Sequence, residues 1–104
     1  MQVQVNHDNH VRIGAEVSER LARLVEDSLT HFGERITRVA MHLGDENATK
    51  GGADDKRCML EARLANHQPV AVTHQAETLQ LAIQGALEKL DRALTHVIGK
   101  WQTH

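Results

Sequence analysis

Polar and apolar residues recur along this chain with two different periods, and the order of these periods limits the folds open to it. Residues 2–6, 36–43, 57–65 and 70–74 alternate between apolar and polar side chains, which is typical of strands with one buried face. Residues 15 to about 32 and 79–101 carry apolar side chains at spacings of three and four, which indicate amphipathic helices. The sequence therefore predicts the order strand, helix, three strands, helix.

The same periods predict which side chains are buried. The inward residues of the second and third strands are Thr37, Val39, Met41, Leu43, Cys58, Leu60, Ala62 and Leu64. The apolar stripes of the two helices consist of Val17, Leu21, Leu24, Val25, Leu29 and Phe32, then Leu79, Ile83, Ala86, Leu90, Ala93, Leu94, Val97 and Trp101. Gly33 is predicted to end the first helix, and Thr78 to cap the start of the second.

These elements assemble most economically into one α+β domain over residues 1–104. A four-stranded sheet carries both helices on one face, so that every apolar surface finds a partner. The three consecutive strands are expected to be antiparallel neighbours, and the first strand is expected to pair in parallel with the second through a right-handed crossover. Residues 44–55, rich in glycine and charge, are predicted to form a loop. The other face of the sheet is left open to solvent.

Several functional classes find no support in the sequence. No apolar run approaches the roughly 20 residues that span a bilayer, and no secretory leader is visible, so we expect a cytoplasmic protein without membrane contact. Cys58 is the single cysteine and cannot form an intrachain disulfide. No nucleophile elbow, phosphate-binding loop or metal-ligand spacing occurs, so neither an enzyme, a cofactor, a metal nor a small-molecule substrate is predicted. The eight histidines are expected on the surface.

Charge is distributed unevenly. The whole chain has 12 basic and 14 acidic residues, a net charge of −2, which gives no general attraction to nucleic acid. Residues 78–104, however, hold three lysines or arginines against two acids. Lys89, Arg92, His96 and Lys100 follow one another at helical spacing and predict a basic stripe beside Glu88, Asp91 and Thr95. Further basic residues stand on the first helix and before or within the second strand: Arg20, Arg23, Arg35 and Arg38.

Two interpretations of this stripe remain open. In one, it is a solvated helix face with ion pairs such as Glu88–Arg92. In the other, it follows the phosphates of a structured RNA without reading bases. Aromatic residues are limited to Phe32 and Trp101, which disfavours single-strand binding by base stacking and agrees with backbone recognition.

The order of elements and several segments resemble the ribosome hibernation-promoting factors, also called ribosome-associated inhibitors or sigma-54 modulation proteins. The resemblance covers nearly the whole chain and is carried by the segments MQVQVNHDNHV, HFGERITRVAMHL, KRCMLEARL, PVAVTHQAETLQLAI and GALEKLDRAL. It implies a β-α-β-β-β-α fold similar to double-stranded RNA-binding domains. It also implies binding to the small ribosomal subunit in the channel of mRNA and tRNA, which silences translation in stress or stationary phase.

In that family, basic residues of the second helix contact ribosomal RNA. The positions that match here are Lys89, Arg92, His96 and Lys100, with Arg35 and Arg38 at the second strand. Among all candidates, Lys89, Arg92, Lys100 and Arg35 are expected to be the main contacts, and Arg20, Arg23, Arg38 and His96 the secondary ones. The chain departs from the family in its weakly basic second helix and its acidic loop at 44–55.

These departures keep alternatives open. One is a protein–protein regulatory module of the same fold with weakened RNA binding. The open sheet face favours it, because this face bears residues of both charges: Arg38, Arg57, Glu61 and Arg63. A weaker one is a metal or pH sensor built from the histidines. The sequence leaves open the oligomeric state, and whether the protein promotes or prevents ribosome dimers.

Overall fold

The computed structural model describes residues 1–45 and 55–102, with side chains up to residue 100. The elements in chain order are β1 (Gln2–His7), α1 (Ala15–Leu29), the 3-10 turn η1 (Thr30–Arg35), β2 (Ile36–Asp45), β3 (Lys56–Leu64), β4 (Val70–Ala76) and α2 (Leu79–Gln102). This is the predicted β-α-β-β-β-α order. The described part of the chain contains no helix with the length and apolar character needed to cross a bilayer.

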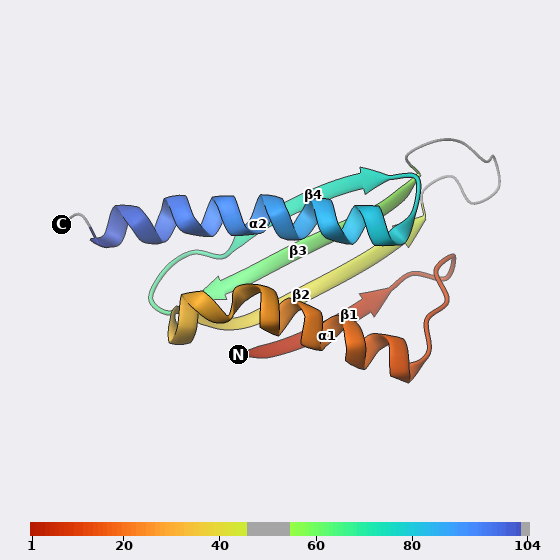
Figure 1. The fold of residues 1–104 in the computed structure, drawn as a ribbon, viewed down its shortest axis with the longest axis horizontal. Coiled ribbons are helices and arrows are strands. Elements are labelled where there is room, and N and C mark those ends of the chain that lie inside the picture. The colour runs from red at the N-terminus through yellow and green to blue at the C-terminus, as the bar shows by residue number, and fades with distance from the viewer. Residues whose placement is uncertain (46–54, 103–104) are drawn as a thin grey trace.

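The four strands form one sheet in the order β1-β2-β3-β4. β1 pairs with β2 in parallel, and the other two pairings are antiparallel, as the connections predicted. Both helices cover the same face, α1 over β1 and β2 and α2 over β3 and β4 (Figure 1). The predicted fold class is therefore confirmed, and the opposite face of the sheet carries no helix.

The core lies between the sheet and the helices. Val39 and Met41 of β2 and Leu60 of β3 are completely buried, and they belong to the same core cluster as Leu90 and Leu94 of α2. The inward sets predicted for β3 and for most of β2 are correct. Thr78 caps α2 as predicted, because its Oγ1 accepts the amide of Leu81 at 3.1 Å. The side chain of Trp101 and residues 46–54 of the predicted loop lie outside the described residues.

One inward assignment in β2 is wrong. Thr37 is exposed, whereas Ile36 is buried, because the β2–β3 register shifts between Ile36 and Arg38. Such a bulge breaks strict alternation and allows Ile36 and Val39 to face the same side. Thr37 Oγ1 instead donates a hydrogen bond to the carbonyl of Arg63 at 3.2 Å.

The predicted ends of two elements also change. α1 stops at Leu29, and the chain continues as η1, in which Phe32 is buried and Gly33 has a φ of 63°. Gly33 tolerates this left-handed conformation because it lacks a Cβ. Gly44 and Asp45, predicted to belong to the loop, continue β2 and pair with Arg57 and Lys56.

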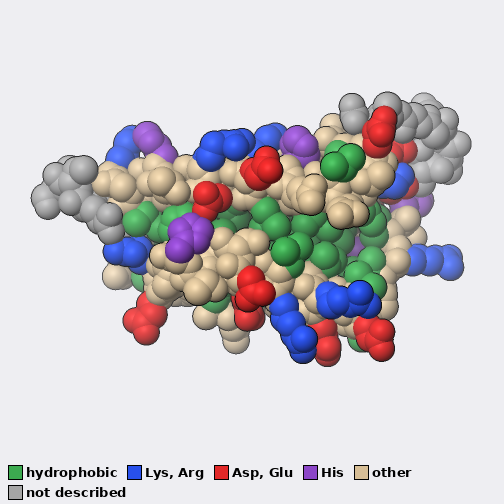
Figure 2. All heavy atoms as spheres, viewed as in Figure 1, with side chains coloured by type: hydrophobic (Ala, Val, Ile, Leu, Met, Phe, Trp, Pro, Cys, Tyr) green, Lys and Arg blue, Asp and Glu red, His purple; other side chains and the backbone are tan. Residues whose placement is uncertain are grey.

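The stripe predicted to be buried along α1 is only partly buried. Val25 and Leu29 are inaccessible, but Val17 and Leu24 remain 38% and 42% exposed. They line an apolar groove of about 670 Å³ between α1 and α2, whose other wall includes Leu79, Ile83 and Leu87. Figure 2 shows apolar side chains along this groove. The two helices thus pack on the sheet more than on each other.

Candidate nucleic-acid interface

The basic stripe of α2 lies on the side of the helix next to β4. It consists of Lys89, Arg92, His96 and Lys100, here called the α2 flank. Lys89 is half-buried, and its Nζ donates to the carbonyl oxygen of Thr73 in β4 at 2.8 Å. Arg92, His96 and Lys100 are exposed and continue along the helix. Figure 2 shows basic side chains gathered along this outer edge of the molecule.

The two acidic side chains of α2 lie differently with respect to the α2 flank. Asp91 Oδ1 meets His31 Nε2 of η1 at 2.8 Å, so this carboxylate is turned towards the first helical segment. Glu88 is exposed, and it borders both the apolar groove and a hollow lined by His74 and Gln75 of β4. Among the ion pairs of the described residues, none joins Glu88 to Arg92, so the pairing considered above is absent there. Asp91 is therefore directed away from the α2 flank, whereas Glu88 remains beside it.

The remaining predicted contacts are dispersed. Arg35 is exposed at the end of η1, where its carbonyl accepts the amide of Ala65 at 3.1 Å. This junction lies at the end of the sheet past which the last turns of α2 extend (Figure 1). Arg20 and Arg23 are exposed on α1 and lie away from the sheet, since Val25 and Leu29 form its buried side. The structure therefore groups four of the eight candidates.

Arg38 lies on the open face of the sheet, opposite to the helices. There it stands directly across from Arg63 of β3, and its Nη2 donates to Gln4 Oε1 of β1. Sequence alternation placed both arginines outward but could not pair them, because the bulge at Thr37 sets the register. The same face carries Asn6 and His42, which no motif had singled out.

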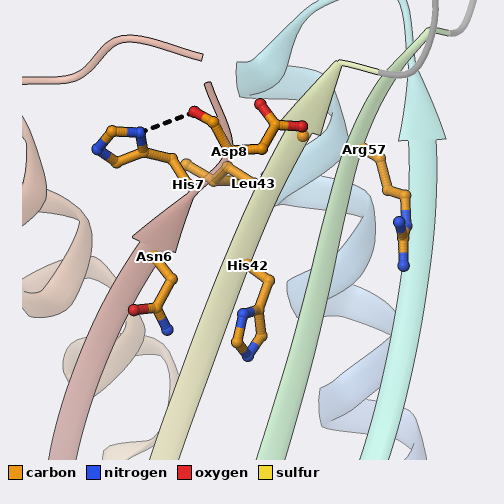
Figure 3. A pocket seen from close by; sticks show the side chains of 7 residues that line it. Asn6, His7, Asp8, His42, Leu43 and Arg57 are labelled. Carbon is orange, nitrogen blue, oxygen red and sulfur yellow. Dashed lines mark hydrogen bonds between the residues drawn. The ribbon is translucent and has the colours of Figure 1, made fainter. Parts of the chain in front are cut away.

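A hollow of about 280 Å³ lies at the end of this face (Figure 3). Asp8 stands over Gly44, where an added Cβ would lie 3.0 Å from the Asp8 carboxylate. The backbone amide of His10, 2.8 Å from Asp8 Oδ1, lowers the pKa of this carboxyl, and the amide of Asp45 adds to the effect. His7 Nδ1 donates to the Asp8 carbonyl at 3.1 Å. Asp8 thus ties the chain after β1 to the end of β2.

A compact charge cluster joins β2 to β3. Lys56 Nζ lies 3.1 Å from Asp45 Oδ2 and 3.0 Å from Asp55 Oδ1. Asp55 is only 5% exposed, and its hydrogen bond, followed by that of Asp45, raises the pKa of Lys56. Within the described residues, no three side chains of metal-binding type come together. The lysine therefore balances the two carboxylates, which is a structural role.

Together, the fold and the α2 flank define a small α+β domain with a basic surface suited to the backbone of a structured nucleic acid. The family model described as "Sigma 54 modulation protein / S30EA ribosomal protein" matches residues 5–102. The chain belongs to this family, which confirms the resemblance seen in the sequence. No curated protein sequence matches the chain.

Solved structures share the fold at low sequence identity. The N-terminal domain of Protein Y from Thermus thermophilus has a TM-score of 0.72 and 14% identity, and the match covers 93% of this chain and 99% of that one. A ribosomal subunit interface protein from Coxiella burnetii has a TM-score of 0.70 and 14% identity, with 95% and 99% covered. At this identity the likeness concerns the fold.

Proposed function

We propose that this protein is a ribosome-associated translation inhibitor, or hibernation factor. It binds ribosomal RNA of the small subunit, in the channel of mRNA and tRNA, in the cytoplasm during stress or stationary phase. The observation that carries the proposal is the row of basic residues along the β4 side of α2, which Lys89 joins to Thr73, while Asp91 is turned away to His31. Membership in a family described as ribosomal supports the choice of partner.

Binding of this kind depends on hydrogen bonds and charge and involves no catalytic step. Arginine and lysine on a rigid helix place positive charge at fixed intervals, and consecutive phosphates of folded RNA can accept their hydrogen bonds. Arg92 and Lys100 are exposed and supply such contacts directly. Lys89 retains further N–H donors after its bond to Thr73, because an ammonium group has three.

The other candidates extend this surface. Arg35 is exposed at the end of η1, directly before β2, and is the remaining main contact. His96 adds charge only when it is protonated. Arg20, Arg23 and Arg38 are secondary contacts, because α1 and the open sheet face present them to other directions than the α2 flank.

A protein–protein regulatory module is the second candidate. The groove beside Val17 and Leu24 favours it, because exposed apolar side chains that lie together are a common feature of protein-binding sites. In that case the partner would be a protein, and association would depend little on salt.

Sedimentation of the pure protein with ribosomes through a sucrose cushion, over a series of salt concentrations, separates the two candidates. We expect the protein to pellet with ribosomes at low salt and to be released as salt rises, because phosphate contacts displace counterions. The double variant Lys89→Ala/Arg92→Ala should be released at lower salt. Failure to pellet at low salt, or retention that ignores salt, would contradict the proposal.

A further inference from the structure

Two arginines face each other across neighbouring strands on the open face of the sheet. Arg38 of β2 and Arg63 of β3 are register partners, and both are exposed. Like charges at directly opposed positions of an antiparallel pair are unfavourable unless an anion lies between them. Guanidinium groups suit this arrangement, because each can hold a phosphate through two parallel hydrogen bonds.

Side chains of β1 orient one of these guanidinium groups. Arg38 Nη2 donates to Gln4 Oε1, and Gln4 Nε2 in turn donates to Asn6 Oδ1 at 3.2 Å. The three side chains therefore form a directed chain of hydrogen bonds across β1 and β2. Asn6 ends it with an amide nitrogen that can still donate. A guanidinium that is held in place loses less entropy when it binds a ligand.

The arginines and this chain border a hollow of about 320 Å³. Ala40 provides room in it, because its small side chain stands between its longer cross-strand partners Gln4 and Glu61. Small-molecule sites start at roughly 300 Å³, so a single nucleotide is of a suitable size. His42 adds a ring nitrogen, and its side chain lies on the same side of the sheet as that of Asn6 (Figure 3).

The hollow also contains the carboxylate of Glu61, which indicates a ligand that carries hydrogen-bond donors as well as a phosphate. Glu61 stands directly between Ala40 and Ala71 in the register, so its own cross-strand partners carry no charge. It lies diagonally from Arg38, at the roughly 7–8 Å typical of such neighbours. A carboxylate repels phosphate but accepts hydrogen bonds from ribose hydroxyls, as in dinucleotide-binding proteins.

We propose that this hollow binds a phosphorylated ribonucleoside. Arg38 and Arg63 hold the phosphate, Glu61 accepts from the ribose hydroxyls, and the amides of Gln4 and Asn6 lie beside the base or sugar. The nucleotide comes either from a free ribonucleoside monophosphate or from one residue of an RNA strand. The site lies across the sheet from the α2 flank and shares only Arg38 with the contacts proposed for ribosomal RNA, so it can fail or hold independently of the flank.

The test is an NMR titration of the ¹⁵N-labelled full chain. The probes are adenosine 5′-monophosphate, its 2′-deoxy analogue, inorganic phosphate and hexauridylate RNA. We expect saturable shifts of the Gln4, Asn6, Arg38 and Arg63 resonances. Arg63→Gln should weaken binding roughly tenfold or more, because hydrogen bonds between charged groups are worth this much. Arg12→Gln, which removes one exposed arginine between β1 and α1, is the control and should leave the affinity unchanged.

Each arm has a distinct meaning. Shifts with the monophosphate support a free nucleotide, and shifts with hexauridylate alone support a nucleotide within RNA. Glu61→Gln should reduce the preference for the ribonucleotide over its deoxy analogue while phosphate contacts persist. Inorganic phosphate binding as tightly as the monophosphate overturns the nucleotide assignment. So does the lack of shifts at these residues with every probe, while dispersed spectra show that each variant is folded.

Discussion

The imidazole of His74 lies against Gly85, so closely that a Cβ at position 85 would overlap the ring. His74 faces the helices from β4, opposite Cys58 in the register, and is half-buried, unlike the surface histidine that the sequence predicted. The glycine costs α2 about 1 kcal/mol of helix propensity relative to alanine. This cost permits the helix to approach the edge strand, which positions the α2 flank beside β4.

Gly85→Ala should therefore destabilise the protein, although alanine is the better helix former. We expect a loss of about 1–3 kcal/mol in the free energy of unfolding, because the ring or the helix must shift. The double variant His74→Ala/Gly85→Ala should recover much of this loss. Urea unfolding of the four proteins in a double-mutant cycle measures the coupling, and strictly additive effects would contradict the contact.

Cys58 should make stability depend on alkaline pH. Burial raises the pKa of this thiol from 9.0 to about 12, so the folded chain keeps the proton in a range where the unfolded chain has lost it. Since the unfolded state then binds fewer protons, the free energy of unfolding falls as pH rises above 9, by up to about 1.4 kcal/mol per pH unit. Cys58→Ala, measured from pH 8 to roughly 11, should show a shallower fall. Parallel curves for both proteins would refute this.

Substitutions of Leu90 and Leu24 should differ in their cost to stability, because Leu90 lies in the core and Leu24 lines the groove. Leu90→Ala should cost about 2–5 kcal/mol, because Leu90 is fully buried under the sheet. Leu24→Ala should cost less than about 1 kcal/mol, since Leu24 is already 42% exposed. Thermal and urea unfolding of both variants check the difference. Equal losses would mean that the groove is closed in solution.

Lys89 and Arg92 should differ in stability although both belong to the α2 flank. Lys89→Ala removes the hydrogen bond to the Thr73 carbonyl and should cost about 0.5–1.5 kcal/mol. Arg92→Ala should change stability by less than about 0.5 kcal/mol, because Arg92 is exposed. Unfolding curves of the two variants decide this. A larger loss for Arg92→Ala would show that the helix depends on a contact of that side chain.

Much of the fold could be predicted because burial imposes a period on the sequence. The alternation in residues 57–65 and the helical stripe around Leu90 and Leu94 each have one consistent partner, so order, pairing and layers follow. The period alone does not predict the exposure of a side chain where a bulge or the spacing of the helices also affects it. Thr37 shows this, since a bulge moves it outward, and Leu24 shows it again, since the spacing of the helices decides its exposure.

The candidate site was predictable in part for a similar reason. Helical spacing alone brings Arg92, His96 and Lys100 together. It cannot show that Lys89 reaches β4, or that Arg38 meets Arg63, because these contacts depend on side-chain reach and strand register. Residues distant in sequence become neighbours only when the tertiary structure forms.

The proposed binding of RNA by the α2 flank is tested most directly by the salt dependence of ribosome binding in two matched variants. Arg92→Gln removes one charge from the flank, and Arg12→Gln removes one from an exposed position outside it. If Arg92 contacts a phosphate, its variant should bind more weakly, and the slope of log affinity against log salt should fall by about one unit, while Arg12→Gln keeps the wild-type slope. Equal slopes and affinities for all three proteins would contradict an RNA-binding α2 flank.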